Sequence, residues 1–236
     1  MRRPIFYDTE TTGIRAESDR IVEIAAYDAE RDTTFHCLIN PGMPIPAEAA
    51  AVHHITDEMV ADAPSFGEVI DDFVAFCDGD AMLVAHNNDA FDLQFLKQEF
   101  RRCDKELPSN WSFFDTLKWA RKYRPDLPKH ALQYLREAYG FEANTAHRAL
   151  DDVIILHKVY LAMTGNLTAE QVFTLIHQAG ALPTTMPFGK HQGTPLAEVP
   201  ETYIQWLLSS GALDKPQNAE LKLALEKLEL LEPAPA

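Results

Sequence analysis

The stretch PIFYDTETTG, residues 4–13, decides the fold, because an apolar run ends there directly in acids. Pro4–Tyr7 predicts a short buried strand, and Asp8 and Glu10 stand at its end. Since side chains alternate across a strand, both carboxylates point to one face and Thr9 points to the other. Neighbouring carboxylates repel each other unless a cation lies between them, and a hard divalent ion such as Mg²⁺ suits that position. A solvated turn before Gly13 is the alternative.

The segments that follow predict an α/β fold, a mixed sheet flanked by helices. Three strands joined by short links come first, which indicates antiparallel neighbours, and strands and helices alternate after them. Beyond Pro4–Tyr7, strands are predicted at Arg20–Tyr27, Thr33–Ile39, Ala81–Ala85 and Trp111–Phe114. Helices are predicted at Glu68–Cys77, Ala90–Arg102, 116–123, 130–139 and 149–163.

A polar linker, Thr164–Thr168, predicts a domain boundary. Residues 1–165 would form the α/β domain and residues 166–236 a small C-terminal helical module. The module has predicted helices near Glu170–Gln178, Glu201–Ser209 and Ala219–Leu231, with a Pro/Gly-rich loop at Pro183–Pro195.

Two further aspartates fall on the apolar arcs of predicted helices. Asp92 does so in the helix that follows the fourth strand, and Asp152 in the last helix of the domain, where Asp151 lies on the polar face. A buried carboxylate must be paired, hydrogen-bonded or metal-bound. The alternative for Asp92 is a place at the helix mouth that water still reaches. His147 is expected on the loop before the last helix, free to reach solvent and substrate.

The candidate ligands are oxygen atoms without thiols, which favours Mg²⁺ or Mn²⁺ over zinc. Two such ions about 3.5–4 Å apart support in-line displacement at phosphorus. Cys37, Cys77 and Cys103 lack CxxC spacing, which argues against a zinc site and a disulfide framework. Reduced cysteines and the lack of a signal peptide or an apolar run of about 20 residues predict a cytoplasmic protein without a membrane segment.

The net charge of −15 argues at first sight against a nucleic-acid partner. The stretch from Lys97 to Lys129 is an exception, with nine Lys and Arg against five acids. It is either a basic surface for phosphates or a solvated helix face.

Three motifs together resemble the DEDD superfamily of 3′→5′ exonucleases, histidine subtype. They are Asp8-Thr9-Glu10-Thr11-Thr12-Gly13, the Phe91-Asp92 pair after an Asn, and His147-Arg148-Ala149-Leu150-Asp151-Asp152. The resemblance covers residues 4–163 and implies a ribonuclease H-like fold. Within the superfamily it is greatest to bacterial exonuclease X, which also carries a small C-terminal module with a loop like Phe188–Gly193.

The resemblance implies roles for the five conspicuous residues. Asp8 would touch both metal ions, Glu10 and Asp152 would hold one, and Asp92 would support the other, often through water. His147 would be the general base that takes a proton from the attacking water, a task that its near-neutral pKa suits.

The resemblance also implies contacts with the terminal nucleotide. The segment Val52–Thr56 places His53 there, although a structural loop histidine is the alternative. Ile14 would be an apolar wedge beside the last base. The remaining expected contacts are Thr9, Thr12 and Asn88. A one-residue insertion would exchange Asn88 for Asn87. Asp115 is expected to cap the helix that follows it.

The prediction is therefore a metal-dependent exonuclease that acts on DNA 3′ ends and releases nucleoside 5′-monophosphates. Trimming of RNA 3′ ends, as by ribonuclease T, is the alternative, and a non-catalytic nucleic-acid adaptor is a weaker one. Association with a polymerase is not readable from the residues.

Overall fold

The computed structural model describes residues 2–142, 149–177, 183–215 and 218–231. Contacts divide the chain into two compact units, Met1–Ile176 and His177–Ala236. None of the described helices is both long and apolar enough to cross a membrane.

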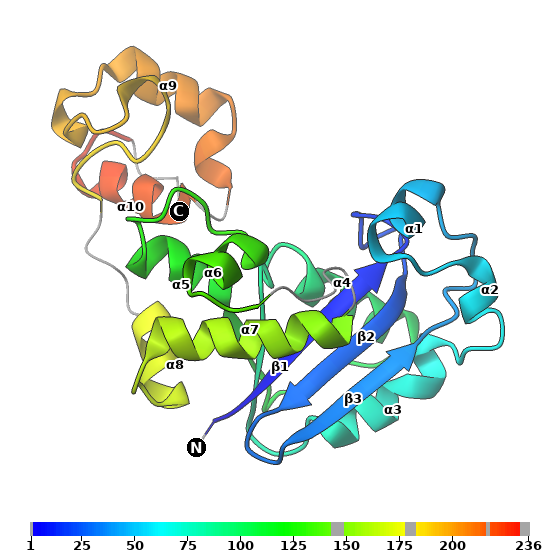
Figure 1. Cartoon of the computed structure of the whole chain (residues 1–236). Coiled ribbons are helices and arrows are strands. Elements are labelled where there is room, and N and C mark those ends of the chain that lie inside the picture. Colours follow the sequence, from blue (N-terminus) through cyan, green and yellow to red (C-terminus); the bar gives the residue numbers. More distant parts are fainter. Residues whose placement is uncertain (1, 143–148, 178–182, 216–217, 232–236) are drawn as a thin grey trace. The chain divides into compact units, whose positions relative to one another are not determined.

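Unit 1 is built on one mixed, five-stranded sheet (Figure 1). The strands lie in the order β3-β2-β1-β4-β5, with β2 antiparallel to β1 and β3, and with β4 parallel to β1 and β5. Their bounds are β1 (Arg3–Thr11), β2 (Ile21–Asp28), β3 (Thr33–Leu38), β4 (Ala81–Ala85) and β5 (Ser112–Asp115). The predicted mixed sheet is confirmed, and the strand that bears Asp8 and Glu10 is its central one.

Helices pack on both faces of this sheet, and Figure 1 shows α7 crossing β1 and β2. The helices of unit 1 are α1 (Ala47–His53), α2 (Asp57–Val60), α3 (Phe66–Phe76), α4 (Asp92–Arg102), α5 (Thr116–Tyr123), α6 (Leu132–Ala138), α7 (Ala149–Thr164) and α8 (Ala169–His177). The capping box at the start of α3, in which the Ser65 amide and hydroxyl donate to Glu68, shows why the helix begins there.

The alternation along β1 decides which face carries the acids. Ile5 and Tyr7 pack into the core that α3 and α4 cover, whereas Phe6 packs into the core that α5, α7 and α8 cover. Asp8 and Glu10 keep the alternation of Phe6, and they therefore project toward the start of α7. Thr9 faces the opposite way, as predicted, and there it contacts Asp92 at the start of α4.

Unit 2 has a small apolar core of its own. Its helices are α9 (Glu201–Ser209) and α10 (Ala219–Lys227), with 3₁₀ turns at Gly189–His191, Leu196–Glu198 and Ala212–Asp214. The buried side chains are those of Met186, Leu196, Val199, Ile204, Leu207, Leu213, Leu221, Ala224, Leu225 and Leu231.

The contacts place α8 with unit 1, whereas the boundary predicted after residue 165 assigns this helix to the C-terminal module. The physical reason is that α8 is amphipathic and its apolar side chains join the core on the α7 face. Val172 is fully buried there, and Phe173, Leu175 and Ile176 pack against it. A polar linker marks where a helix ends, but it does not tell which core the next helix joins.

Candidate active site

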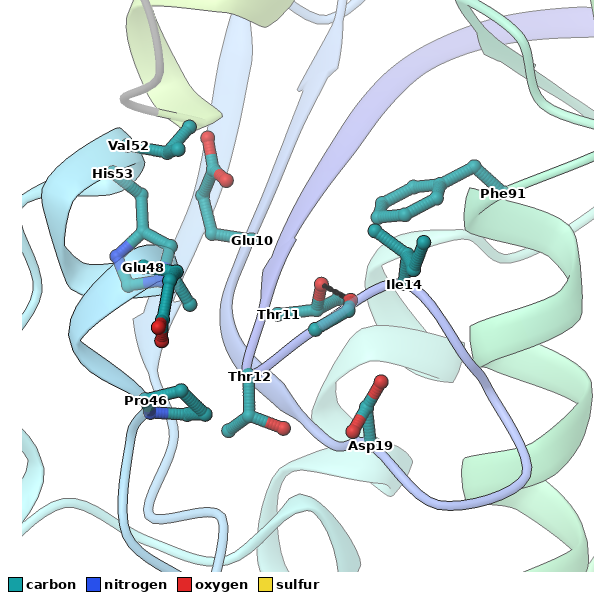
Figure 2. A pocket seen from close by; sticks show the side chains of 12 residues that line it. Glu10, Thr11, Thr12, Ile14, Asp19, Pro46, Glu48, Val52, His53 and Phe91 are labelled. Atoms are coloured by element: carbon teal, nitrogen blue, oxygen red, sulfur yellow. Dashed lines mark hydrogen bonds between the residues drawn. The ribbon is translucent and has the colours of Figure 1, made fainter.

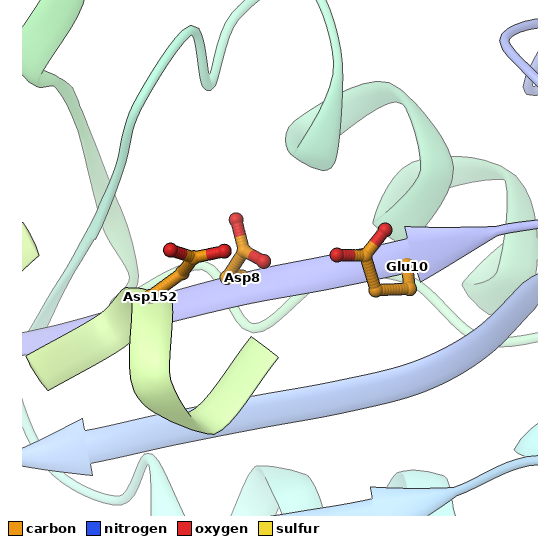
Figure 3. A group of neighbouring side chains, drawn as sticks. All are labelled: Asp8, Glu10 and Asp152. Carbon is orange, nitrogen blue, oxygen red and sulfur yellow. The ribbon is translucent and has the colours of Figure 1, made fainter. Parts of the chain in front are cut away.

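Three carboxylates meet where β1 passes the start of α7. One ligand oxygen from each of Asp8, Glu10 and Asp152 lies within 4.8 Å of the others. Figure 3 shows Asp8 and Glu10 projecting from β1 and Asp152 from the first turns of α7. Asp152 is buried and Asp151 is exposed, which confirms the distinction that the helix periodicity predicted. The donor set consists of carboxylate oxygens and fits a hard divalent cation.

The electrostatics of the cluster favour a cation. Burial raises the pKa of Asp8 well above its ordinary value, and the nearby charges of Asp92, Glu10, Asp152 and Glu23 raise this pKa further. Burial also raises the pKa of Asp92, to about 7, although hydrogen bonds from Thr9 oppose the rise. Acids this close are stable as carboxylates only beside a positive charge.

Asp92 approaches from the α4 side and lies outside the three-carboxylate group. It is the first residue of α4, and its Oδ1 accepts hydrogen bonds from the Thr9 amide (3.1 Å) and the Thr9 hydroxyl (2.8 Å). Thr9, which is 3% exposed, therefore holds Asp92 in place, and its hydroxyl is directed at this carboxylate. The prediction that Asp92 is buried is confirmed.

The loop between β4 and α4 is fixed by an aspartate on the neighbouring strand. Asp115 accepts hydrogen bonds from the amides of Asn87 (3.1 Å) and Asp89 (3.2 Å), and it also accepts from two amides at the start of α5. The predicted helix cap is thus confirmed, and the same carboxylate orients the loop that delivers Asp92. Asn88 in this loop is fully buried and its Oδ1 accepts from the Tyr7 hydroxyl, whereas Asn87 is exposed at a φ of 67°.

A pocket of about 440 Å³ adjoins the three carboxylates and shares Glu10 with them. Figure 2 shows His53 and Val52 of α1 on one side of it, and Ile14 and Phe91 on the other. Three of the expected nucleotide contacts, Thr12, Ile14 and His53, line this pocket. Ile14 is 83% exposed, which is unusual for a large apolar side chain and is typical of a surface that binds an apolar group. Thr9 and Asn88 are not among the lining residues.

Two residues that the sequence did not single out fix the start of α7. Glu23 on β2 is fully buried, and it accepts hydrogen bonds from the Ala149 amide (3.1 Å) and interacts with the His36 ring (2.7 Å). Gln133 on α6 donates to Asp152 Oδ1 at 3.0 Å. A charge inside the apolar run of β2 was a usable signal for Glu23, while no pattern in the sequence marks Gln133.

The basic stretch from Lys97 to Lys129 is partly occupied by internal ion pairs. Arg102 pairs with Glu99, Lys105 with Asp71, Lys118 with Asp89, and Arg124 with Asp126. Four of the nine cations thus have acidic partners within unit 1, which supports the solvated-face interpretation for about half of the stretch. His147 lies in residues 143–148, outside those that the structure describes.

Comparison with known families divides the chain at nearly the same place as its contacts do. Residues 5–160 match the family model described as Exonuclease. Residues 176–228 match a model described as a putative quorum-sensing-regulated virulence factor, which covers unit 2 and specifies no chemistry.

Curated relatives and a solved structure agree with the first match. The DNA polymerase III subunit epsilon of Treponema pallidum is 39% identical over 66% of this chain and 74% of its own length. Exonuclease DPD1 of Arabidopsis thaliana is 38% identical over 69% of this chain, and the match spans 56% of the length of DPD1.

The structure of Exonuclease X in complex with 5′ overhanging duplex DNA is 30% identical, with a TM-score of 0.57 over 73% of this chain and 99% of that one. A structure of Exonuclease I, 21% identical with a TM-score of 0.62 over 74% of this chain and 43% of that one, shares the fold. The chain therefore belongs to the exonuclease family, among the 3′→5′ exonucleases of the DEDD superfamily.

Proposed function

We propose that this exonuclease removes nucleotides from DNA 3′ ends in a reaction that depends on two divalent cations, Mg²⁺ or Mn²⁺, and releases nucleoside 5′-monophosphates. The observation that carries the proposal is the meeting of Asp8, Glu10 and Asp152 beside a pocket that shares Glu10. The pocket suits a terminal nucleotide, and the carboxylates stand where its phosphate would enter.

Asp8, Glu10 and Asp152 would hold the cations, with Asp92 supporting one of them from the α4 side. Divalent cations in such a site neutralise charge on the phosphate and lower the pKa of bound water. The raised pKa of Asp8 supports this assignment, because its carboxylate is buried among the like charges of Asp92, Glu10 and Asp152.

The protein's own groups would position the substrate and move the proton. His147, two residues before α7 begins, would accept the proton of the attacking water. Thr12, Ile14 and His53 would hold the terminal nucleotide in the pocket. Buried Asn88 would anchor the loop that carries Asp92, while Thr9 orients that carboxylate directly.

The preference for DNA rests on the relatives, one of which is a DNA polymerase subunit and another of which was solved with DNA. RNA trimming remains the competing activity. The similarity to a DNA polymerase III subunit also supports an association of this chain with a DNA polymerase.

The test is incubation of 3′- and 5′-labelled single-stranded DNA, duplex DNA and RNA with the full chain, with Mg²⁺, with Mn²⁺ and with EDTA. We expect stepwise shortening from the 3′ end of DNA, which EDTA stops. Asp152→Asn should abolish shortening, and the matched control Asp151→Asn should retain activity within a few-fold. Equal losses of activity in these two variants would contradict the assignment of the metal ligands. Faster shortening of RNA than of DNA would show that RNA is the preferred substrate.

A further inference from the structure

A stack of aromatic rings lies at one surface of unit 2, with Trp206 exposed and with Tyr203 and His191 half-buried. Trp206 on α9 is 56% exposed, although the neighbouring Ile204 and Leu207 are buried in the core. Its ring stacks on Tyr203 with a centroid distance of 5.5 Å and an interplanar angle of 26°. His191 packs edge-on against Tyr203 at 4.7 Å. Trp206 and Tyr203 are therefore stacked, and the His191 ring meets Tyr203 at an interplanar angle of 64°. We name Lys190, His191, Tyr203 and Trp206 the α9 platform.

The loop that carries Lys190 and His191 is held by its own backbone hydrogen bonds and lies close to Tyr203. The Met186 amide donates to the Thr194 carbonyl and the Gly193 amide donates to the Met186 carbonyl, both at 2.8 Å. Gly189 has a φ of +77°, and a Cβ at this position would collide with the Tyr203 hydroxyl. A glycine is thus required both for the turn and for the close approach to Tyr203. The loop geometry is set before any ligand arrives, which reduces the entropy lost on binding.

The charged group next to these rings in the sequence is the Lys190 ammonium, which can bind an anion. Lys190 is exposed and forms no ion pair with any described residue, unlike Lys222, which pairs with Asp214 at 2.8 Å. Flat rings next to an unpaired cation match an unpaired base followed by its phosphate. A metal ion would require carboxylates or paired imidazoles, and a second apolar protein surface would gain nothing from the cation.

We propose that the α9 platform binds single-stranded nucleic acid, with a base stacked on Trp206 and Lys190 contacting a phosphate. The inference rests on the proposed function, since it adds a holding site to a nuclease, but it does not involve the carboxylates. Unit 2 would retain the strand between rounds of cleavage. Duplexes, whose bases are already stacked, would bind this surface more weakly.

The test measures binding apart from cleavage. Full-length protein in EDTA is titrated with a labelled oligothymidylate, and its affinity is followed by anisotropy. Trp206→Ala should weaken binding about 5- to 150-fold, as for the loss of one base–aromatic stack. Trp206→Phe should recover part of the affinity. Leu208→Ala, which removes another exposed apolar side chain of α9, is the matched control and should bind like the wild type.

Two further readouts report on the contacts themselves. Trp206 is exposed whereas Trp111 and Trp119 are 8% and 2% exposed, so quenching of tryptophan fluorescence on binding should vanish in Trp206→Phe. Lys190→Gln should reduce the slope of log K against log salt by about 0.7, the value for one phosphate on a single strand.

The outcomes separate this inference from the proposed function. Wild-type-like affinity in folded Trp206→Ala overturns the platform, whatever the nuclease activity. Loss of affinity in Trp206→Ala with unchanged hydrolysis of a dinucleotide supports it. Binding that depends on Trp206 in a chain that hydrolyses no nucleic acid would leave the platform standing and overturn the nuclease assignment. Equal affinity of the platform for duplex and single strands would contradict base stacking.

Discussion

We expect the ion-pair network around Glu99 to hold the pocket in shape, although Glu99 itself does not line the pocket. Glu99 on α4 is fully buried, and Arg20 contacts both of its oxygens, at 2.7 and 3.0 Å. Arg102 donates to Glu99 at 2.9 Å and also to the carbonyls of residues 16, 17 and 19 at 2.9–3.0 Å. The network therefore ties the loop between β1 and β2, which carries Ile14, to α4.

Glu99→Gln keeps the shape of the side chain but leaves two guanidinium groups without their anion. Breaking a buried ion pair on one side costs about 3–5 kcal/mol. The side chains of Arg20 and Arg102 are 28% and 23% exposed, so water solvates their charges in part. We therefore expect the free energy of unfolding to fall by about 3 kcal/mol, the lower end of that range. In a chain of this size, that lowers the melting temperature of unit 1 by roughly 6–12 °C.

The assay is urea and thermal unfolding followed by circular dichroism, together with KM for a DNA 3′ end. We expect KM to rise because the loop carrying Ile14 loses its anchor. Glu106→Gln is the control, since Glu106 is exposed and pairs with no described cation; it should change stability by less than about 0.5 kcal/mol. A Glu99→Gln chain within about 1 kcal/mol of the wild type would refute the argument from the buried pair.

Three further changes test the supports of the site. Thr9→Val removes the hydroxyl that holds Asp92 and should lower kcat/KM about tenfold or more. Thr9→Ser, which keeps the hydroxyl, should restore kcat/KM. Equal kcat/KM in both variants would show that the hydroxyl does not contribute to activity. Asp115→Ala removes a helix cap and the anchor of the loop before α4, so the free energy of unfolding in urea should fall by at least about 1–2 kcal/mol. A smaller decrease would show that the loop keeps its conformation without Asp115. Burial lowers the pKa of His86 to about 4, so the stability it contributes is complete above its ordinary pKa near 6.5 and is lost as the pH falls toward 4. Melting curves at pH 7 and 5 should show a smaller acid loss in His86→Gln than in the wild type, while exposed His54→Gln should match the wild type.

Much of the site could be predicted from the chain alone, because period and polarity are local properties. The spacing of Asp8 and Glu10 on a strand requires a common face, and the helical period separates buried Asp152 from exposed Asp151. The order of strands and helices likewise predicted the mixed sheet. These inferences need only the alternation of apolar and polar residues within one element.

Other features were decided by tertiary packing, since they depend on elements far apart in the sequence. The side chains of Glu23 and Gln133 reach α7 only because β2 and α6 pack beside it. The side chain that accepts the hydrogen bond from the Thr9 hydroxyl is Asp92, 83 residues away in the sequence.

The burial of Asn88 and the membership of α8 in unit 1 were equally unreadable from the sequence. An asparagine in a polar loop has the same local pattern whether it faces solvent or the Tyr7 hydroxyl, and an amphipathic helix joins whichever core offers its apolar stripe a matching surface. The sequence by itself thus determined which residues must be buried and which must share a face. Only the three-dimensional packing decided their partners, because contacts between distant segments leave no periodic trace along the chain.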